Sequence, residues 1–301
     1  MKFVVLILLA SIGCVNGEMN FYFYFHCLVL YPGQQKMMKI FGKVLDVDLD
    51  EVTIGLEPVS NFKCVDDCFQ TDGCILVFMN SGGKCFSFDF NSTKKLTVVE
   101  TKREEGLMVA FKTRFLLDQC PAYDDMDLLV TVGEDPIPWI KNGNMYTFEK
   151  CVRDWKMYTR ENGVTVCMQT FKEEIYSLVN AIKRCDELGG YKLTGVQSKE
   201  ELQWIFDRRT STWHKNSGFW INAKRLEEYS RMNDTHFNIT DGYTTLDQEF
   251  YRKFADLSGS NIGIIEDCLL VCNAAPGFLI NDIQCSDYTY AKGFVCGYQL
   301  V

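Results

Sequence analysis

The sequence predicts an α+β protein made of two modules, each held together by disulfide bonds. The chain has 301 residues with 14 cysteines and only 3 histidines, which favours disulfides over histidine-rich metal sites. Stretches with helical spacing of apolar residues and stretches with alternating ones occur in both halves. An acidic, proline-containing segment separates two groups of cysteines. The length suits two domains of ordinary size.

The N-terminus predicts a secreted protein. Lys2 precedes an apolar stretch over 3–12, and the small residues Val15 and Gly17 follow, which is typical of a signal peptide over residues 1–17. The apolar stretch is too short to span a membrane. Secretion implies an oxidising compartment, in which cysteines pair. Asn-x-Ser/Thr sequences mark candidate glycosylation sites at Asn91, Asn233 and Asn238.

Residues 18–37 form an aromatic-rich segment that includes the run Phe21–Tyr31. The run is too short for a membrane span, and its exposure would promote aggregation. Our hypothesis is a translated intron in the gene model, because Phe and Tyr codons are rich in uracil. The alternative is an additional buried strand.

The first module is predicted over residues 38–116 and carries four cysteines. Its expected elements are a helix over 61–70 and strands over 74–79 and 85–90. Ser60 can cap the helix, and Cys64 and Cys68 share one helix face because they are four residues apart. Cys74 and Cys85 open the two strands. The four cysteines can form two nested disulfides, which a secreted chain favours, or can bind zinc.

The spacing C-x3-C-x5-C-x10-C from Cys64 to Cys85, followed by a closing strand over 106–113, resembles the nematode-type PAN (apple-like) module. The resemblance implies a helix packed on an antiparallel sheet. It also implies Cys68–Cys74 as the inner disulfide and Cys64–Cys85 as the outer one. PAN modules bind proteins or glycans and are not enzymes, so the resemblance supplies no catalytic residue.

Residues 117–150 are predicted to form an acidic linker. The segment contains several Asp and Glu residues together with prolines, and such segments tend to stay extended. Cys120 and Trp139 nevertheless indicate that it contacts one of the modules.

The second module is predicted over residues 151–301. Its expected elements are a helix over 171–188, a strand over 192–196, a helix over 199–207, a buried strand over 219–223 and a long polar loop over 228–264. Gly189 and Gly190 end the first helix, and Ser198 with Glu201 forms a capping box for the second. A loop of such length is usually functional or held in place by disulfide bonds.

The order of landmarks in this module resembles a C-type lectin-like domain. The landmarks are the stretch Cys185–Glu200, W-I-N-A at Trp220–Ala223 where the family has W-I-G-L, E-D-C at Glu266–Cys268, N-D-x2-C at Asn281–Cys285 and F-V-C at Phe294–Cys296. The resemblance implies two helices, antiparallel sheets and a long loop region. The implied disulfides are Cys151–Cys167, Cys185–Cys296 and Cys268–Cys285.

Loss of Cys14 with the signal peptide leaves an odd number of cysteines. The disulfides implied by the two resemblances leave Cys27, Cys120 and Cys272 over. If Cys27 is not part of the real protein, Cys120 and Cys272 can form a further disulfide between the linker and the second module.

The lectin-like pattern also suggests a calcium site in the loop region. In sugar-binding members, calcium is held by a Glu-Pro-Asn motif, a Glu before one cysteine and an Asn-Asp pair before the next. Glu266, Asn281 and Asp282 match, but residues 258–261 stand in place of Glu-Pro-Asn, with Asn261 as a candidate substitute. Calcium affinity follows ligand charge, so the resemblance implies a degenerate Ca2+ site, and Ca2+ is the one candidate cofactor.

The sequence therefore predicts a secreted extracellular binding protein that recognises carbohydrate or glycoprotein, with calcium dependence left open. The alternative is a calcium-independent protein-interaction or structural module without a sugar site. A net charge of -9 gives no basic footprint for a nucleic-acid partner. The chain is not expected to be an enzyme, because His214 and His236 lie in no nucleophile motif.

Overall fold

The computed structural model describes residues 35–45, 60–90, 94–114, 128–132, 135–229, 235–257, 265–286 and 289–301. The predicted signal peptide and most of the aromatic-rich segment lie outside the described residues. The end of that segment, Gln35–Met37, begins the first strand, β1 (Gln35–Leu45). Among the described helices, none is long and apolar enough to cross a membrane.

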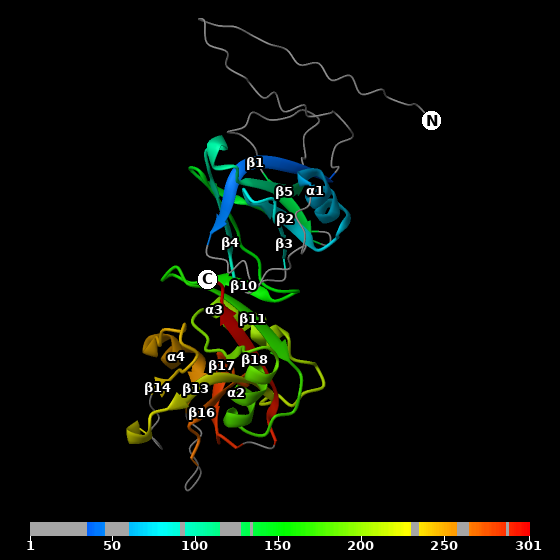
Figure 1. The fold of residues 1–301 in the computed structure, drawn as a ribbon. Helices are drawn as coiled ribbons and strands as arrows, with labels where there is room; N and C mark the ends of the chain where they lie inside the picture. Colours follow the sequence, from blue (N-terminus) through cyan, green and yellow to red (C-terminus); the bar gives the residue numbers. More distant parts are fainter. Residues whose placement is uncertain are drawn as a thin grey trace, which may run out of the picture.

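The first module is an antiparallel sheet in the order β3-β2-β5-β1-β4-β9-β8, with one helix packed against it (Figure 1). Besides β1, its strands are β2 (Cys74–Met79), β3 (Cys85–Asp89), β4 (Leu96–Glu100), β5 (Met108–Arg114), β8 (Ile140–Asn142) and β9 (Met145–Phe148). A 3-10 helix, η1 (Arg103–Glu105), precedes β5, and β6 (Leu129–Val132) pairs with β7 (Asp135–Pro138) in a separate hairpin. Helix α1 (Asn61–Gln70) begins after Ser60, whose hydroxyl accepts a hydrogen bond from the Lys63 N–H at 3.3 Å. The predicted cap and helix bounds are therefore confirmed.

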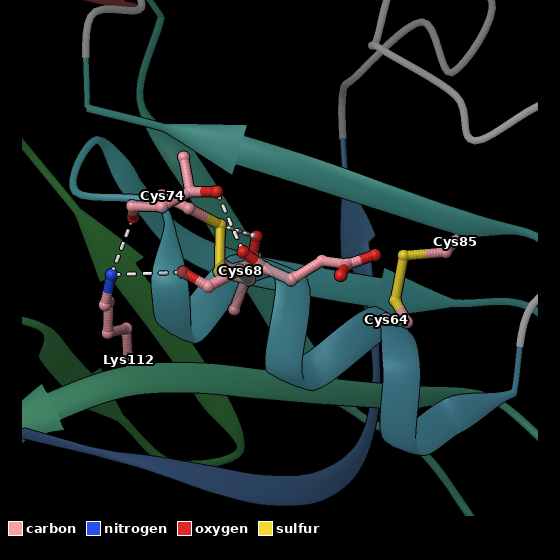
Figure 2. The surroundings of a disulfide bond; sticks show 8 residues. Cys64, Cys68, Cys74, Cys85 and Lys112 are labelled. Atoms are coloured by element: carbon pink, nitrogen blue, oxygen red, sulfur yellow. Dashed lines mark hydrogen bonds between the residues drawn. A yellow bond between two sulfur atoms is a disulfide. The ribbon is translucent and has the colours of Figure 1, made fainter.

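Two disulfides, Cys64–Cys85 and Cys68–Cys74, fasten α1 to the β2–β3 hairpin (Figure 2). They are the pairings that the resemblance implied, and they leave none of these four sulfurs as a thiolate for zinc. The ammonium of Lys112, from β5, donates to the carbonyls of Cys68 at 3.1 Å and Thr71 at 2.7 Å (Figure 2). Each of these carbonyls also accepts one backbone N–H, from Thr71 and Cys74 respectively, so the ammonium adds a second, charged donor at the helix C-terminus. Burial lowers the pKa of Lys112.

The segment predicted as a linker is, in its described part, a component of the first module. Strand β9 pairs with β4, which places Phe148 opposite Leu96. Trp139 is 5% exposed and packs edge-on against Phe111, with 4.8 Å between ring centroids. Burial of these aromatic rings outweighs the tendency of an acidic, proline-containing segment to stay extended. The expectation of an extended linker is thus wrong for residues 128–132 and 135–148.

The second module is a mixed sheet in the order β10-β11-β18-β13-β16-β17-β15, with β12 beside β18 and β14 beside β13. Its strands are β10 (Lys156–Thr159), β11 (Thr165–Phe171), β12 (Lys192–Leu193), β13 (Gly218–Arg225), β14 (Phe237–Asn238), β15 (Ala255–Asp256), β16 (Cys268–Ala275), β17 (Phe278–Ile283) and β18 (Ala291–Gln299). The pairs β13–β18 and β15–β17 are parallel, and the other pairs are antiparallel. Its disulfides are Cys151–Cys167, Cys185–Cys296 and Cys268–Cys285, again the pairings that the resemblance implied.

The first helix of this module is shorter than predicted. Helix α2 covers Leu178–Glu187 and begins after Ser177, whose hydroxyl accepts from the Asn180 N–H at 3.2 Å. Residue Phe171 instead ends β11, where it pairs with Phe294 and stacks on its ring at 5.4 Å. Sheet pairing with a distant strand therefore takes Phe171 out of the predicted helix, and residues 172–177 form neither helix nor strand.

Helix α3 (Lys199–Asp207) has the predicted bounds, but only half of the predicted capping box. The Ser198 hydroxyl accepts from the Glu201 N–H at 3.1 Å. In a full capping box, the Glu201 carboxylate would accept from the Ser198 N–H. Here it accepts from the Gln197 N–H at 2.8 Å instead and pairs with Arg160. A buried cation competes successfully with the backbone for this carboxylate.

The stretch predicted as a long polar loop, 228–264, contains regular structure in its described part. Besides β14 and β15, it forms the 3-10 helix η3 (Glu227–Tyr229) at its start and helix α4 (Gln248–Phe254). Asp247 caps α4, and the buried Tyr251 donates its hydroxyl to the Val196 carbonyl at 3.0 Å. Capping and burial of aromatic rings thus anchor a stretch whose composition alone favours a loop.

Candidate functional site

Sheet pairing brings together the residues that the sequence marked as candidate ligands. Asn281 and Asp282 lie on β17, which pairs with one edge of β16. Glu266 and Asp267 directly precede β16. Strand β13 pairs with the other edge of β16 and ends at Arg225, whose backbone N–H donates to the Asp267 carbonyl at 2.6 Å. The site therefore combines three neighbouring segments of one sheet (Figure 1).

The guanidinium of Arg225 connects these segments. Its Nη1 donates to Oδ1 of Asp267 at 3.1 Å and to the backbone carbonyl of Glu266, and its Nη2 donates to Oδ2 of Asp282 at 3.1 Å. The side chains of Arg225 and Asp282 are each 1% exposed, and that of Asp267 is 10% exposed. Hydrogen bonds between charged groups in such a setting are strong, and removing one partner leaves a buried charge unpaired.

Asp282 is the most buried carboxylate of this cluster. Burial raises the pKa of its carboxyl to about 6, and the Arg225 guanidinium opposes that rise. Among the described residues, its Oδ1 has no hydrogen-bond partner. Asn281 is half-buried and donates from Nδ2 to the Asp282 carbonyl at 3.0 Å. Glu266 is also half-buried, and Asn261 lies outside the described residues.

These residues do not fit calcium in the arrangement that the structure shows. Calcium takes about six to eight oxygen ligands. Here an oxygen of Asp267, an oxygen of Asp282 and the Glu266 carbonyl already accept hydrogen bonds from one positively charged group. A second cation among the same oxygens would be repelled by that group. Across the described ranges, no group of three or more His, Cys, Asp or Glu side chains is arranged to hold a metal.

Sequence reasoning missed the central residue of the site. Arg225 is the last residue of β13 and lies just beyond the predicted strand 219–223, where an arginine is usually exposed, so no local signal distinguishes it. Only the pairing of β13 with β16 places it beside Asp267. The signal that could have identified Arg225 is the acidic Asp267 directly before the buried strand β16. That signal becomes usable only once β16 is known to be the neighbour of β13.

A stacked aromatic pair lies close to the site along the chain. The rings of Tyr229 and His236 are parallel within 10°, with 4.0 Å between centroids. The Leu226 N–H, one residue after Arg225, donates to the His236 carbonyl at 2.9 Å. Both rings are half-buried, so part of each remains accessible to a ligand.

A second buried network fixes the base of the loop region. Arg160 donates from Nε and Nη2 to the two oxygens of Glu201 at 2.8 and 3.1 Å, and from Nη1 to Oγ1 of Thr244 at 2.8 Å. Asp241 accepts from the Gly195 N–H at 2.8 Å and from the Thr244 hydroxyl at 2.6 Å. The network joins the turn after β10, helix α3 and residues 241–244.

The remaining predicted sites have mixed outcomes. Cys272 is a free, buried thiol, so it does not form the further disulfide, and Cys27 and Cys120 lie outside the described residues. Burial raises the pKa of the Cys272 thiol to about 12. Asn238 is exposed on β14, which suits a glycosylation acceptor, while Asn91 and Asn233 lie outside the described residues.

Comparisons with known proteins identify the first module. Residues 37–113 match the family model of the PAN-like domain, which confirms the expected PAN-like module. No curated protein matches the chain.

Among solved structures, the chain is similar to the mouse scavenger receptor C-type lectin carbohydrate-recognition domain, with 22% identity over 49% of this chain and 94% of that one and a TM-score of 0.33. Human lithostathine has 16% identity over 50% and 99% of the two chains, with a TM-score of 0.36. Herring type II antifreeze protein has 19% identity over 49% and 98%, with a TM-score of 0.35. The likeness lies in the C-terminal part of the chain and concerns the fold alone.

Proposed function

We propose that the chain is a secreted, extracellular binding protein and not an enzyme. Its second module recognises carbohydrate, free or on a glycoprotein, without bound calcium. The observation that carries this proposal is that sheet pairing brings the segments of Glu266, Asn281 and Asp282 together, with the Arg225 guanidinium bound to the Glu266 carbonyl and to Asp282. The disulfides of both modules agree with an oxidising, extracellular compartment.

The chemistry around the site suits sugar hydroxyls. The half-buried amide of Asn281 offers both a donor and an acceptor, and carboxylates accept from hydroxyl groups. The Tyr229–His236 pair provides aromatic surface against which the apolar face of a sugar ring can pack. The rigid sheet and its disulfides hold these groups in place before a ligand arrives, which lowers the entropic cost of binding.

A protein partner is the second candidate, and the first module favours it. Phe62 and Phe69 occupy one face of α1, seven residues apart, and their exposed fractions are 76% and 37%. Exposed aromatic side chains of this kind are enriched at protein interfaces. In this alternative, α1 carries the binding surface and the second module has no sugar site.

A glycan array with the full secreted chain, run with calcium and with a chelator, tests the first proposal. We expect binding to a defined set of glycans that is equal in both conditions. Asn281→Ala should weaken it about fivefold to thirtyfold, since losing a hydrogen bond to a ligand costs roughly 1–2 kcal/mol. Asn180→Ala, at an exposed position of α2, is the matched control and should bind as the wild type does.

Three outcomes would count against the sugar site. They are the absence of glycan binding, binding that the chelator abolishes, and equal loss in both Asn variants. Capture of a cell-surface protein that Phe62→Ser abolishes and Asn281→Ala leaves intact would instead support the protein-binding alternative.

A further inference from the structure

Arg225 is placed among the residues that the sequence marked as calcium ligands, and it contacts both segments that carry them. Its Nη1 donates to residues 266–267 before β16, and its Nη2 donates to Asp282 on β17. Arginine suits this position because its planar fork of donors can serve several oxygens at once, and its charge persists at every physiological pH.

The electrostatics of the cluster require a cation. Asp267 and Asp282 carry two nearby carboxylates whose side chains are at most 10% exposed. Buried carboxylates without a compensating charge destabilise a fold. In the described part of the cluster, Arg225 supplies that charge from within the chain.

Asp282 retains an oxygen for which Arg225 provides no partner. The residue is 1% exposed, its Oδ2 accepts from Arg225, and its Oδ1 has no hydrogen-bond partner among the described residues. The Arg225 guanidinium donates to only one of the two Asp282 carboxylate oxygens. A metal ion could bind both oxygens of the same carboxylate. The Asp282 carboxylate therefore keeps an acceptor oxygen that a metal ion could use.

We propose that the Arg225 guanidinium takes the place of a divalent cation in this module, so that the end of the sheet bearing Glu266 and Asp282 is assembled without metal. Removing the guanidinium would leave a pocket lined by Asp267, Asp282 and the Glu266 carbonyl, which is a set of hard oxygen ligands for calcium. This inference deepens the proposed function, because it names what replaces calcium there. Its test reads stability and metal binding instead of ligand binding, so the two proposals can fail separately.

The experiment measures thermal unfolding of the full chain with about 10 mM calcium and with a chelator, a concentration above the Kd range of weak extracellular sites. The wild type should unfold at the same temperature in both conditions, within about 1 °C. Without calcium, Arg225→Ala should lower the transition temperature of the second module on the order of 10 °C. Calcium should restore on the order of 5 °C of that loss, and calorimetric titration should detect binding to the variant alone.

Arg184→Ala is the matched control, because Arg184 lies on α2 in more exposed ion pairs with Glu173 and Glu187. It removes the same charge and should show neither the large loss nor a calcium response. If Arg225→Ala fails to fold, Arg225→Gln removes the charge while keeping donors and should also respond to calcium. A wild type that calcium stabilises, or that the chelator destabilises, would overturn the proposal. So would Arg225 variants that fold but ignore calcium.

Discussion

Replacing Glu201 by Ala should strongly destabilise the second module. Glu201 is fully buried and accepts two hydrogen bonds from Arg160, at 2.8 and 3.1 Å, and one from the Gln197 N–H at 2.8 Å. Its removal leaves the Arg160 guanidinium, whose side chain is 2% exposed, with an uncompensated charge. Breaking a buried pair in this way costs about 3–5 kcal/mol. For a module of this size, that corresponds to a fall in transition temperature of roughly 10 °C.

The assay is urea and thermal unfolding of the full chain, followed by tryptophan fluorescence. The double variant Arg160→Met with Glu201→Leu should lose less stability than Glu201→Ala alone, because neither member of the pair then stays behind as an unpaired buried charge. Glu187→Ala is the matched control: this carboxylate is 47% exposed and pairs with Lys183 at 3.6 Å, so its loss should cost about 0.5 kcal/mol or less.

Two results would refute this reasoning about Glu201. One is a cost for Glu201→Ala that is no larger than that of Glu187→Ala. The other is a double variant at least as unstable as Glu201→Ala, which would show that packing around these side chains, and not the unpaired charge, determines the cost.

Two further predictions concern other buried groups. Lys112→Met should lower the unfolding free energy of the first module by about 1–3 kcal/mol in urea denaturation, because the carbonyls of Cys68 and Thr71 each lose a charged donor and keep only one backbone N–H; unchanged stability would contradict this role of the ammonium. Cys272, with its buried thiol and a pKa raised to about 12, should resist alkylation in the native protein at neutral pH and react fully after unfolding. Mass spectrometry measures this, and alkylation of the native chain would contradict the buried position.

The two modules hold their candidate binding surfaces in place by different interactions. In the second, buried ion pairs at Arg225 and Arg160 hold together segments that are distant in sequence. In the first, two disulfides and Lys112 hold α1 against the sheet while Phe62 stays exposed. Both arrangements fix a surface in advance, which lowers the entropic cost of binding a ligand.

Local signals in the sequence determined much of the secondary structure. Helices α1 and α3 have the predicted bounds because a serine cap, the spacing of apolar residues and the next turn all lie within a few residues of each other. The strands of the first hairpin follow from alternation and from the turn between them. The disulfide pairings followed from resemblance to known families, since spacing alone leaves several connectivities open.

Contacts between distant residues decided the rest. The end of β11 before α2, the strands in 128–132 and 135–148, and the partner of Glu201 all depend on strands and side chains far away in the chain. The same holds for the candidate site. Glu266, Asn281 and Asp282 could be named from the sequence, but the charge between them could not. Arg225 reaches the Glu266 carbonyl, Asp267 and Asp282 only because β13 and β17 flank β16, and the order of strands in a sheet is a property of the whole fold.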